Sequence, residues 1–224
     1  MLLQNQVGQP AAAGNNALLN GRSGQLGDQI VSELHGRYYE TTYRGNSYFS
    51  GHGSLLALSA NTITLTATTT PILGVWNPLS NTNNLVILQA ALNVVANNLT
   101  SGAGPGVFVW AISLGNGAIS TGNLPYNART LLQSGSAARG FAGNVALTGL
   151  SNNLVIAAGS TLPSPGGLTY TTLASTALLP SYCGVENFDG SLIVPPGGVL
   201  ALLNTTSSTV FSAAGRLVWE EVPV

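Results

Sequence analysis

Few residues in the sequence carry side chains suited to catalysis or to metal binding. His35 and His52 are the only histidines, and Cys183 is the only cysteine. A structural zinc site needs about four ligands from Cys, His or carboxylate side chains. Cys183 together with Glu186 or Asp189 is too sparse a set to supply them. We therefore predict neither a metal site nor a bound cofactor.

Glu186 and Asp189 lie three residues apart and invite comparison with a glycosidase, in which two carboxylates flank the scissile bond. Asp189 precedes Gly190, however, and an Asp-Gly pair is more typical of a turn. The Gly-x-Ser-x-Gly motif of a hydrolase nucleophile is absent from the sequence. We predict that the protein is not an enzyme. A carbohydrate-active enzyme is kept as a third hypothesis, and its turnover would disappear in Glu186→Gln.

A stretch rich in aromatic residues and arginine, residues 37–49, has two functional interpretations. Its rings are Tyr38, Tyr39, Tyr43, Tyr48 and Phe49, and its cations are Arg37 and Arg44. Exposed rings can stack on sugars, as in receptor-binding modules, and Tyr and Arg are enriched where proteins contact proteins. A third interpretation is that these rings simply alternate between the core and the surface of one strand.

Charge is scarce and unevenly distributed along the chain. Charged residues make up 6% of the sequence, against roughly 25% in an average soluble domain. Lysine is absent, and residues 45–128 and 140–185 carry no formal charge. Such neutral surfaces suggest burial against copies of the same chain or against a larger shell, although an ordinary neutral monomer is the alternative. The net charge of −1 without a basic cluster argues against nucleic-acid binding, and no apolar run reaches membrane-spanning length.

Residues 1–33 are dominated by Gln, Asn, Gly and Ala and show no sustained helical or strand periodicity. A segment of this composition does not bury enough apolar area to fold alone. We expect an extended N-terminal arm that orders against a neighbour through Leu18, Leu19, Leu26 and Ile30; a disordered leader is the alternative. The first ten residues do not resemble a signal peptide. With a single cysteine, the chain fits synthesis in a reducing cytoplasm.

The rest of the chain, residues 34–224, reads as one all-β domain. Alternating or apolar runs of strand length occur at 34–50, 61–67, 85–95 and 107–114, with shorter ones at 145–148, 154–158 and 168–172. In the run 107–114, Phe108, Trp110, Ile112 and Leu114 are expected to share one face. Gly, Pro and Asn separate the runs. This pattern predicts an antiparallel β-sandwich, jelly-roll-like, preceded by the arm.

The C-terminal segment carries the strongest strand signals. Residues 192–194, 199–203 and 217–222 read as three closing strands of an antiparallel sheet. The tetrapeptide at 195–198, Pro-Pro-Gly-Gly, is predicted to turn a corner between the first two. In the last strand, Leu217, Trp219 and Glu221 share one face, and Trp219 is the expected core anchor.

Two blocks of the sequence resemble virion structural proteins of tailed bacteriophages, the small jelly-roll proteins that decorate or cement capsids. They are HGRYYETTYRGN at 35–46 and SLIVPPGGVLAL with GRLVWEEVPV near the C-terminus, together about a quarter of the chain. The resemblance implies a non-enzymatic homotrimer in the virion that sits on a shell of major capsid protein and holds neighbouring capsomers together.

Under this hypothesis the arm and the charged region 22–44 reach the shell or an adjacent subunit. The residues expected to contact the partner are Leu18, Leu19, Arg22, Leu26, Ile30, Arg37, Tyr39, Tyr43 and Arg44. The alternative hypothesis is a tail or baseplate receptor-binding protein that uses the aromatic stretch on glycans.

Overall fold

The computed structural model describes residues 5–6, 21–22, 37–52, 56–57, 68–96, 102–103, 106–119, 122–133, 135–142, 146–162, 169–170, 181–205, 208 and 211–224. The chain divides into two compact units, Met1–Glu40 and Thr41–Val224. In the first, strands β1 (Asn5–Gln6) and β2 (Gly21–Arg22) pair in parallel. The rest of the expected arm, and the expected strand at 61–67, lie outside the described residues.

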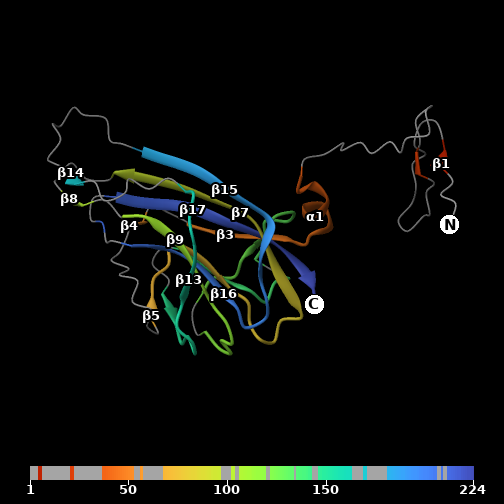
Figure 1. The fold of residues 1–224 in the computed structure, drawn as a ribbon. Coiled ribbons are helices and arrows are strands. Elements are labelled where there is room, and N and C mark those ends of the chain that lie inside the picture. The colour runs from red at the N-terminus through yellow and green to blue at the C-terminus, as the bar shows by residue number, and fades with distance from the viewer. Residues whose placement is uncertain are drawn as a thin grey trace. The chain divides into compact units, whose positions relative to one another are not determined.

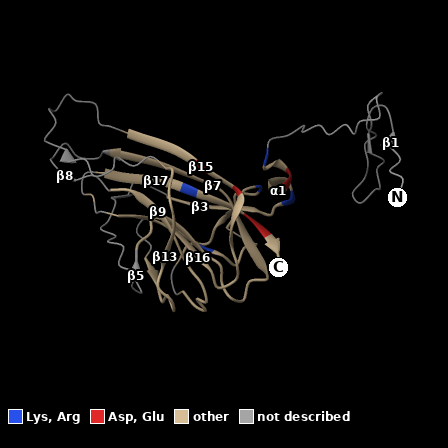
Figure 2. Ribbon diagram, viewed as in Figure 1, with Lys and Arg blue, Asp and Glu red and all other residues tan. Residues whose placement is uncertain are grey.

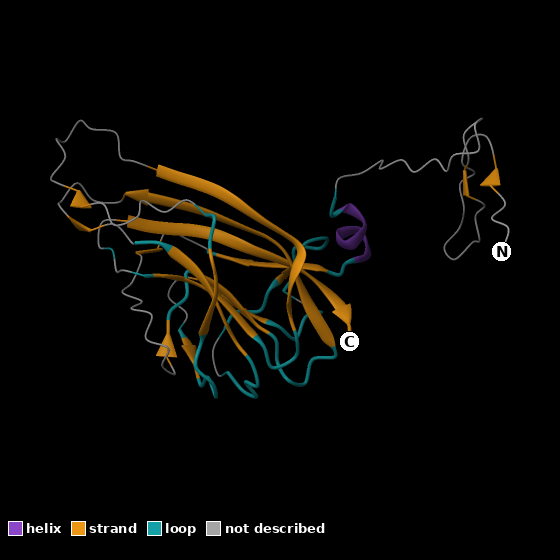
Figure 3. Ribbon diagram, viewed as in Figure 1, coloured by secondary structure: helices purple, strands orange, loops and turns teal. Residues whose placement is uncertain are grey.

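The second unit is a sandwich of two antiparallel sheets (Figure 1). The sheet that we call the long-strand sheet has the order β10 (Tyr126–Asn127), β3 (Ser47–Gly51), β17 (Phe211–Pro223), β7 (Asn83–Ala96), β15 (Ser181–Val194), and β4 (Leu56–Ala57) also pairs with β17. The short-strand sheet has the order β11 (Arg139–Ala142), β6 (Leu73–Trp76), β16 (Val199–Asn204), β9 (Phe108–Ser113), β13 (Val155–Gly159). Two small ladders pair β5 (Thr68–Thr69) with β12 (Leu147–Thr148) and β8 (Gly102–Ala103) with β14 (Thr169–Tyr170). Figure 3 shows how strands dominate this unit, and the predicted all-β sandwich is confirmed.

The connections between the principal strands follow a jelly roll. The last strand, β17, returns between β3 and β7 in the long-strand sheet, and β16 returns between β6 and β9 in the short-strand sheet. These long returns beside earlier strands are the Greek-key feature of the jelly roll. They correct one expectation, because the three C-terminal strands are not neighbours in one sheet. β15 and β17 flank β7, whereas β16 belongs to the opposite sheet.

A continuous apolar core fills the space between the sheets. Trp219 on β17 and Trp110 on β9 are almost completely buried in it, together with Phe108. Trp219 is thus confirmed as the anchor of the last strand. Leu114, by contrast, does not continue the buried face of Phe108 and Trp110; 55% of it is exposed because β9 ends at Ser113.

A second apolar cluster covers the outer face of the short-strand sheet. Residues of β6, β9, β11 and β16 that point away from the main core pack there against Ile119, Leu150 and Leu154 from the loops beyond β9 and β12. Both faces of β16 are therefore buried, which explains why its sequence, VLALLN, is a continuous apolar run and not an alternating one. The long-strand sheet has no corresponding cluster among the described residues.

Residues 39–44, expected to belong to a strand, form the short helix α1 (Tyr39–Arg44). Glu40 in the first turn and Arg44 in the last turn suit the helix dipole. Gly45 ends the helix with a φ of 81°. The amides of Gly45 and Asn46 donate to the carbonyl oxygens of Thr42 and Thr41, the two hydrogen bonds of a Schellman cap. The strand predicted from residue 34 therefore begins only at Ser47.

The Pro-Pro-Gly-Gly tetrapeptide turns the chain from β15 into β16, as predicted. Gly197 has a φ of 80°, a conformation that glycine adopts without the strain of a side chain. Its amide donates to the carbonyl of Asn77 at 2.7 Å, and that of Gly198 donates to the carbonyl of Pro195 at 2.8 Å. The corner thus connects the two sheets and is bonded to the loop that follows β6.

Candidate functional site

Several of the residues expected to contact a partner cannot be placed. Leu18, Leu19, Leu26 and Ile30 lie outside the described residues. Arg22 ends β2, where its backbone pairs with Gln6. The proposed role of the arm therefore stays a prediction.

The other expected contact residues lie in and just before α1. Arg37 and Arg44 are exposed, as are Tyr39 and Tyr43. The guanidinium carbon of Arg129 lies 5.3 Å above the centre of the Tyr43 ring, a cation–π contact that links α1 to the loop after β10. Figure 2 shows that α1 is one of the places where charge gathers and that β17 carries charge as well, with an arginine along the strand and acidic residues near its C-terminal end.

The aromatic stretch is divided by the fold. Tyr48 faces the main core and is 7% exposed, whereas Phe49 is the next residue on β3 and faces outward. Only Phe49 therefore joins the outer face of the long-strand sheet. Tyr48 and Phe49 thus occupy alternate core and surface positions of one strand, as the third interpretation expected. Tyr39 and Tyr43 belong to α1 and not to that strand.

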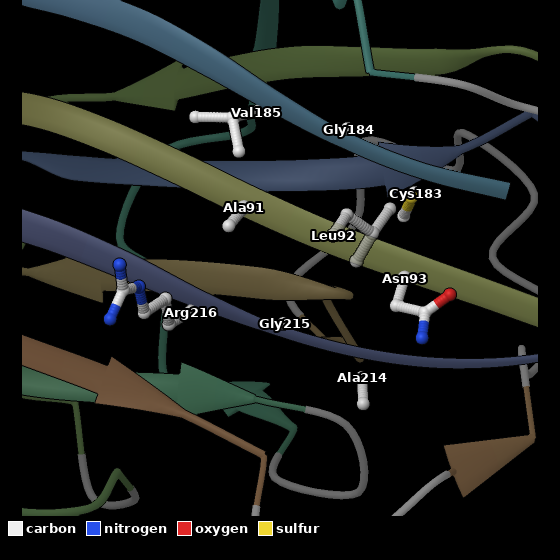
Figure 4. A pocket seen from close by; sticks show the side chains of 9 residues that line it. All are labelled: Ala91, Leu92, Asn93, Cys183, Gly184, Val185, Ala214, Gly215 and Arg216. Atoms are coloured by element: carbon white, nitrogen blue, oxygen red, sulfur yellow. The ribbon is translucent and has the colours of Figure 1, made fainter.

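The outer face of the long-strand sheet carries a shallow depression, the small-residue groove, of ≈ 500 Å³. It runs across β15, β7 and β17, as Figure 4 shows. Its lining includes Ala91, Asn93, Cys183, Val185, Ala214 and Arg216. Small side chains leave the surface flat, and Arg216 is the single charged group among the described residues of the lining. This groove therefore suits contact with a protein surface more than capture of a polar small molecule.

A second depression, the aromatic groove, lies where β3, β10 and β17 meet, and its volume is ≈ 530 Å³. Phe49 and Tyr126 stack at its side with ring centroids 5.5 Å apart and planes inclined by 21°. They are cross-strand partners of β3 and β10, and 41% of Tyr126 is exposed. The polar side chains of its lining are those of Ser50, His52, Asn123, Gln133 and Arg216, beside the Tyr126 hydroxyl.

His52 in the aromatic groove is held by the backbone of β17. The amide of His52 donates to the carbonyl of Gly215 at 3.0 Å. Nδ1 of His52 lies 3.0 Å from the amide nitrogen of Gly215 and 3.2 Å from its carbonyl oxygen, so it accepts from the amide in the Nε2–H tautomer and donates to the carbonyl in the Nδ1–H tautomer. Burial lowers the pKa of His52, with the hydrogen bond to the Gly215 backbone acting in the opposite direction. Because its pKa is lowered from the ordinary value of about 6.5, the ring is neutral at pH 7.

Glu186 and Asp189 serve the fold. The indole of Trp110 donates to Glu186 Oε2 at 2.9 Å and the hydroxyl of Ser160 donates to the same oxygen at 2.7 Å. Asp189 and Gly190 have φ angles of 52° and 81° within a register shift of β15 against β7, so the pair forms a bulge inside the strand and not the expected turn. A role for Glu186 as a structural acceptor accounts for its contacts without any catalytic function.

Metal-ligating side chains do not gather in the described part of the chain, where no group of three or more His, Cys, Asp or Glu residues has suitable geometry. His35 is outside that part. Cys183 is exposed on the rim of the small-residue groove. Among these residues there is also no helix long and apolar enough to cross a membrane.

The sequence did not point to Tyr126, Asn123 or Gln133. All three belong to the segment after β9 that was expected to be a loop, and no periodicity marks them. The one local signal is that Tyr126 stands alone among Asn, Pro and Gly residues, where an aromatic side chain has no strand of its own to bury it. Comparison with protein-family models, with curated proteins and with solved structures finds no match to this chain.

Proposed function

We propose that this chain is a virion structural protein that decorates and cements a phage capsid, binding the outer surface of a shell of major capsid protein as a homotrimer. The proposal extends the resemblance of residues 35–46 and of the C-terminal segment to such proteins. It requires a rigid domain, a surface for other copies and a separate segment for the shell.

The observation that carries the proposal is that the outer face of one sheet is covered by the chain and the outer face of the other is not. The outer face of the short-strand sheet is covered by the chain's own loops, whereas that of the long-strand sheet presents small and apolar side chains such as Ala91, Ala214 and Val185. Val185 is 56% exposed. An exposed sheet face lined by small and apolar side chains is typical of a surface that another subunit covers.

Attachment by a trimer gains from multivalency. Three modest contacts on one rigid body act at high effective concentration, so the assembly stays bound although each contact is weak. The exposed residues in and just before α1 suit the shell-facing role because Tyr and Arg are enriched at interfaces; they are Arg37, Tyr39, Tyr43 and Arg44.

The test combines oligomeric state with copy number. Light scattering on the full chain should give a trimer, and quantitative mass spectrometry of virions that carry it should give hundreds of copies with immunogold on the head. Ala91→Arg, which places a charge in the small-residue groove, should weaken the trimer. Val107→Arg, at an exposed position outside that groove, is the matched control. A monomer absent from heads would overturn the proposal.

A tail or baseplate receptor-binding protein is the alternative, and the aromatic groove favours it. The same labelling separates the two: a handful of copies at the tail would support adsorption and reject cementing.

A further inference from the structure

We propose that the aromatic groove is a binding site for a short saccharide, with one sugar ring against the Phe49–Tyr126 pair and its hydroxyl or carboxylate groups on Arg216 and the side-chain amides. The site adjoins the small-residue groove and shares Gly215 and Arg216 with it, but its aromatic pair and its carboxamides lie outside that groove.

The aromatic pair supplies an apolar surface of the right kind. Ring faces carry partial negative charge, and the C–H groups on one side of a pyranose carry partial positive charge, so the two attract weakly in addition to their burial. Tyr126 keeps 41% of its surface exposed although it stacks on Phe49. An exposed ring that is already held by a neighbour loses little conformational entropy when a ligand stacks on it.

The polar lining matches hydroxyl groups better than it matches phosphates or peptides. Asn123 and Gln133 each offer a carboxamide, which both donates and accepts as a hydroxyl does. The Nε2 of Gln133 donates to the carbonyl of Leu124 at 3.0 Å, which fixes the orientation of its amide. The neutral imidazole of His52 adds a further uncharged polar group. With only one cation in the lining, a nucleotide would lack the charge that its phosphates need.

Arg216 gives the site its preference among sugars. It is exposed on β17, and within the described residues its one hydrogen bond is a long contact of 3.5 Å to Oε1 of Gln89. A guanidinium presents parallel donors that fit a carboxylate or two adjacent hydroxyls. Among the described residues, the lining contains no Asp or Glu that would repel an acidic sugar. We therefore expect uronic or similar acidic saccharides to bind more tightly than their neutral counterparts.

The volume of the groove suits such a ligand. At ≈ 530 Å³ it lies within the range of roughly 300–1,000 Å³ that small-molecule sites occupy. It is also built on strands: β3, β10 and β17 hold Phe49, Tyr126 and Arg216 in fixed register. A site on paired strands keeps its geometry better than one on loops alone.

The test is a screen of the full chain on an array of neutral and acidic glycans, followed by titration of the strongest ligand. Tyr126→Ala should weaken binding by about tenfold or more, equivalent to about 1.4 kcal/mol, while Tyr126→Phe should stay within about threefold of the wild type. Val107→Ala is the control, since Val107 is an exposed apolar residue outside the groove. Arg216→Gln should abolish the preference for acidic ligands.

Mapping by NMR on the unmodified chain keeps the proposal testable if a variant fails to fold. Added ligand should shift the signals of Phe49, Tyr126 and Gly51 and leave those of the small-residue groove beyond Arg216 in place. Absence of binding to every glycan at millimolar concentration, or tight binding to a proline-rich peptide instead, would overturn it. Trimer formation and head occupancy are measured separately, so failure of this site leaves the decoration proposal intact.

Discussion

Trp110 and Trp219 offer a matched pair for testing how the core is stabilised. Both indoles are buried in the same cluster, at 1% and 0% exposure. The Nε1 of Trp110 donates to the carboxylate of Glu186 at 2.9 Å. For the Nε1 of Trp219 no acceptor lies within hydrogen-bond reach among the described residues. Replacing each by phenylalanine removes a similar volume. At Trp110 the change also removes a hydrogen bond, whereas at Trp219 it removes a buried donor that has no acceptor among the described residues.

The magnitudes follow from this difference. Trp→Phe loses about two buried ring carbons, which costs about 2 kcal/mol of unfolding free energy at ~0.8 kcal/mol per buried carbon with a small cavity. Trp110→Phe also removes a hydrogen bond to a charged group, worth about 1.5–3 kcal/mol. Trp219→Phe removes a buried donor without an acceptor, which returns about 1–3 kcal/mol. We expect Trp219→Phe to be nearly neutral and Trp110→Phe to be the less stable variant by roughly 3 kcal/mol or more.

Urea denaturation of the two variants and the wild type measures this difference directly. In thermal unfolding, a gap of ~3 kcal/mol corresponds to roughly 6–12 °C in Tm for a domain of this size. Trp219→Ala serves as a control for volume and should cost about 3–5 kcal/mol. Equal losses for the two phenylalanine variants would show that hydrogen bonding of the indoles does not decide the outcome, and the reasoning would be refuted.

Three other changes test separate parts of the structure. Gly197→Ala should destabilise by about 1–2 kcal/mol because φ is 80° and a Cβ would lie 2.7 Å from Leu79 Cδ2; Gly159→Ala, with nothing within 4 Å, should be within about 1 kcal/mol of neutral in the same urea titration. The lowered pKa of His52 means that the unfolded state takes up its proton first as the pH falls. The stability that neutral His52 contributes is therefore complete above ~6.5 and is lost below it, so urea midpoints at pH 7.5 and 5 should differ less in His52→Gln than in the wild type; an unchanged difference would contradict this. Deleting residues 1–33 should leave a folded, soluble domain that no longer binds capsids, and full occupancy by the truncated chain would reject the role of the arm.

The fold was accessible from sequence wherever one strand face is buried and the other is not. The alternation of β17 identified Trp219 as a core anchor, and the run of β9 placed Phe108 and Trp110 on one face, because burial on one face imposes a period of two. The sheet to which each strand belongs could not be predicted in the same way. β15, β16 and β17 follow each other in sequence, yet β16 crosses to the opposite sheet, since a Pro-Gly corner does not encode whether its two strands pair or separate.

Helix α1 shows where local pattern misleads. Alternating Tyr and Thr residues have high strand propensity, so residues 38–44 read as a strand. The amides of Gly45 and Asn46 donate to the carbonyls of Thr42 and Thr41, and these bonds cap a helical turn in place of the expected strand. The aromatic groove was inaccessible for another reason: Phe49 and Tyr126 are 77 positions apart in the sequence, and only the pairing of β10 with β3 brings them into contact.

The distribution of charge implies that self-association and attachment to a shell respond differently to salt. In the described part of the chain the small-residue groove contains a single charged group, Arg216, so the proposed contact between copies through that face depends on apolar burial, which added salt does not weaken. Contact through exposed Arg37 and Arg44 is electrostatic in part and is screened once the Debye length falls to roughly 3 Å near 1 M salt. Raising the salt concentration should therefore release the protein from capsids while its oligomer persists in light scattering. Release as monomers, or retention of full occupancy at high salt, would show that the two contacts are not separated in this way.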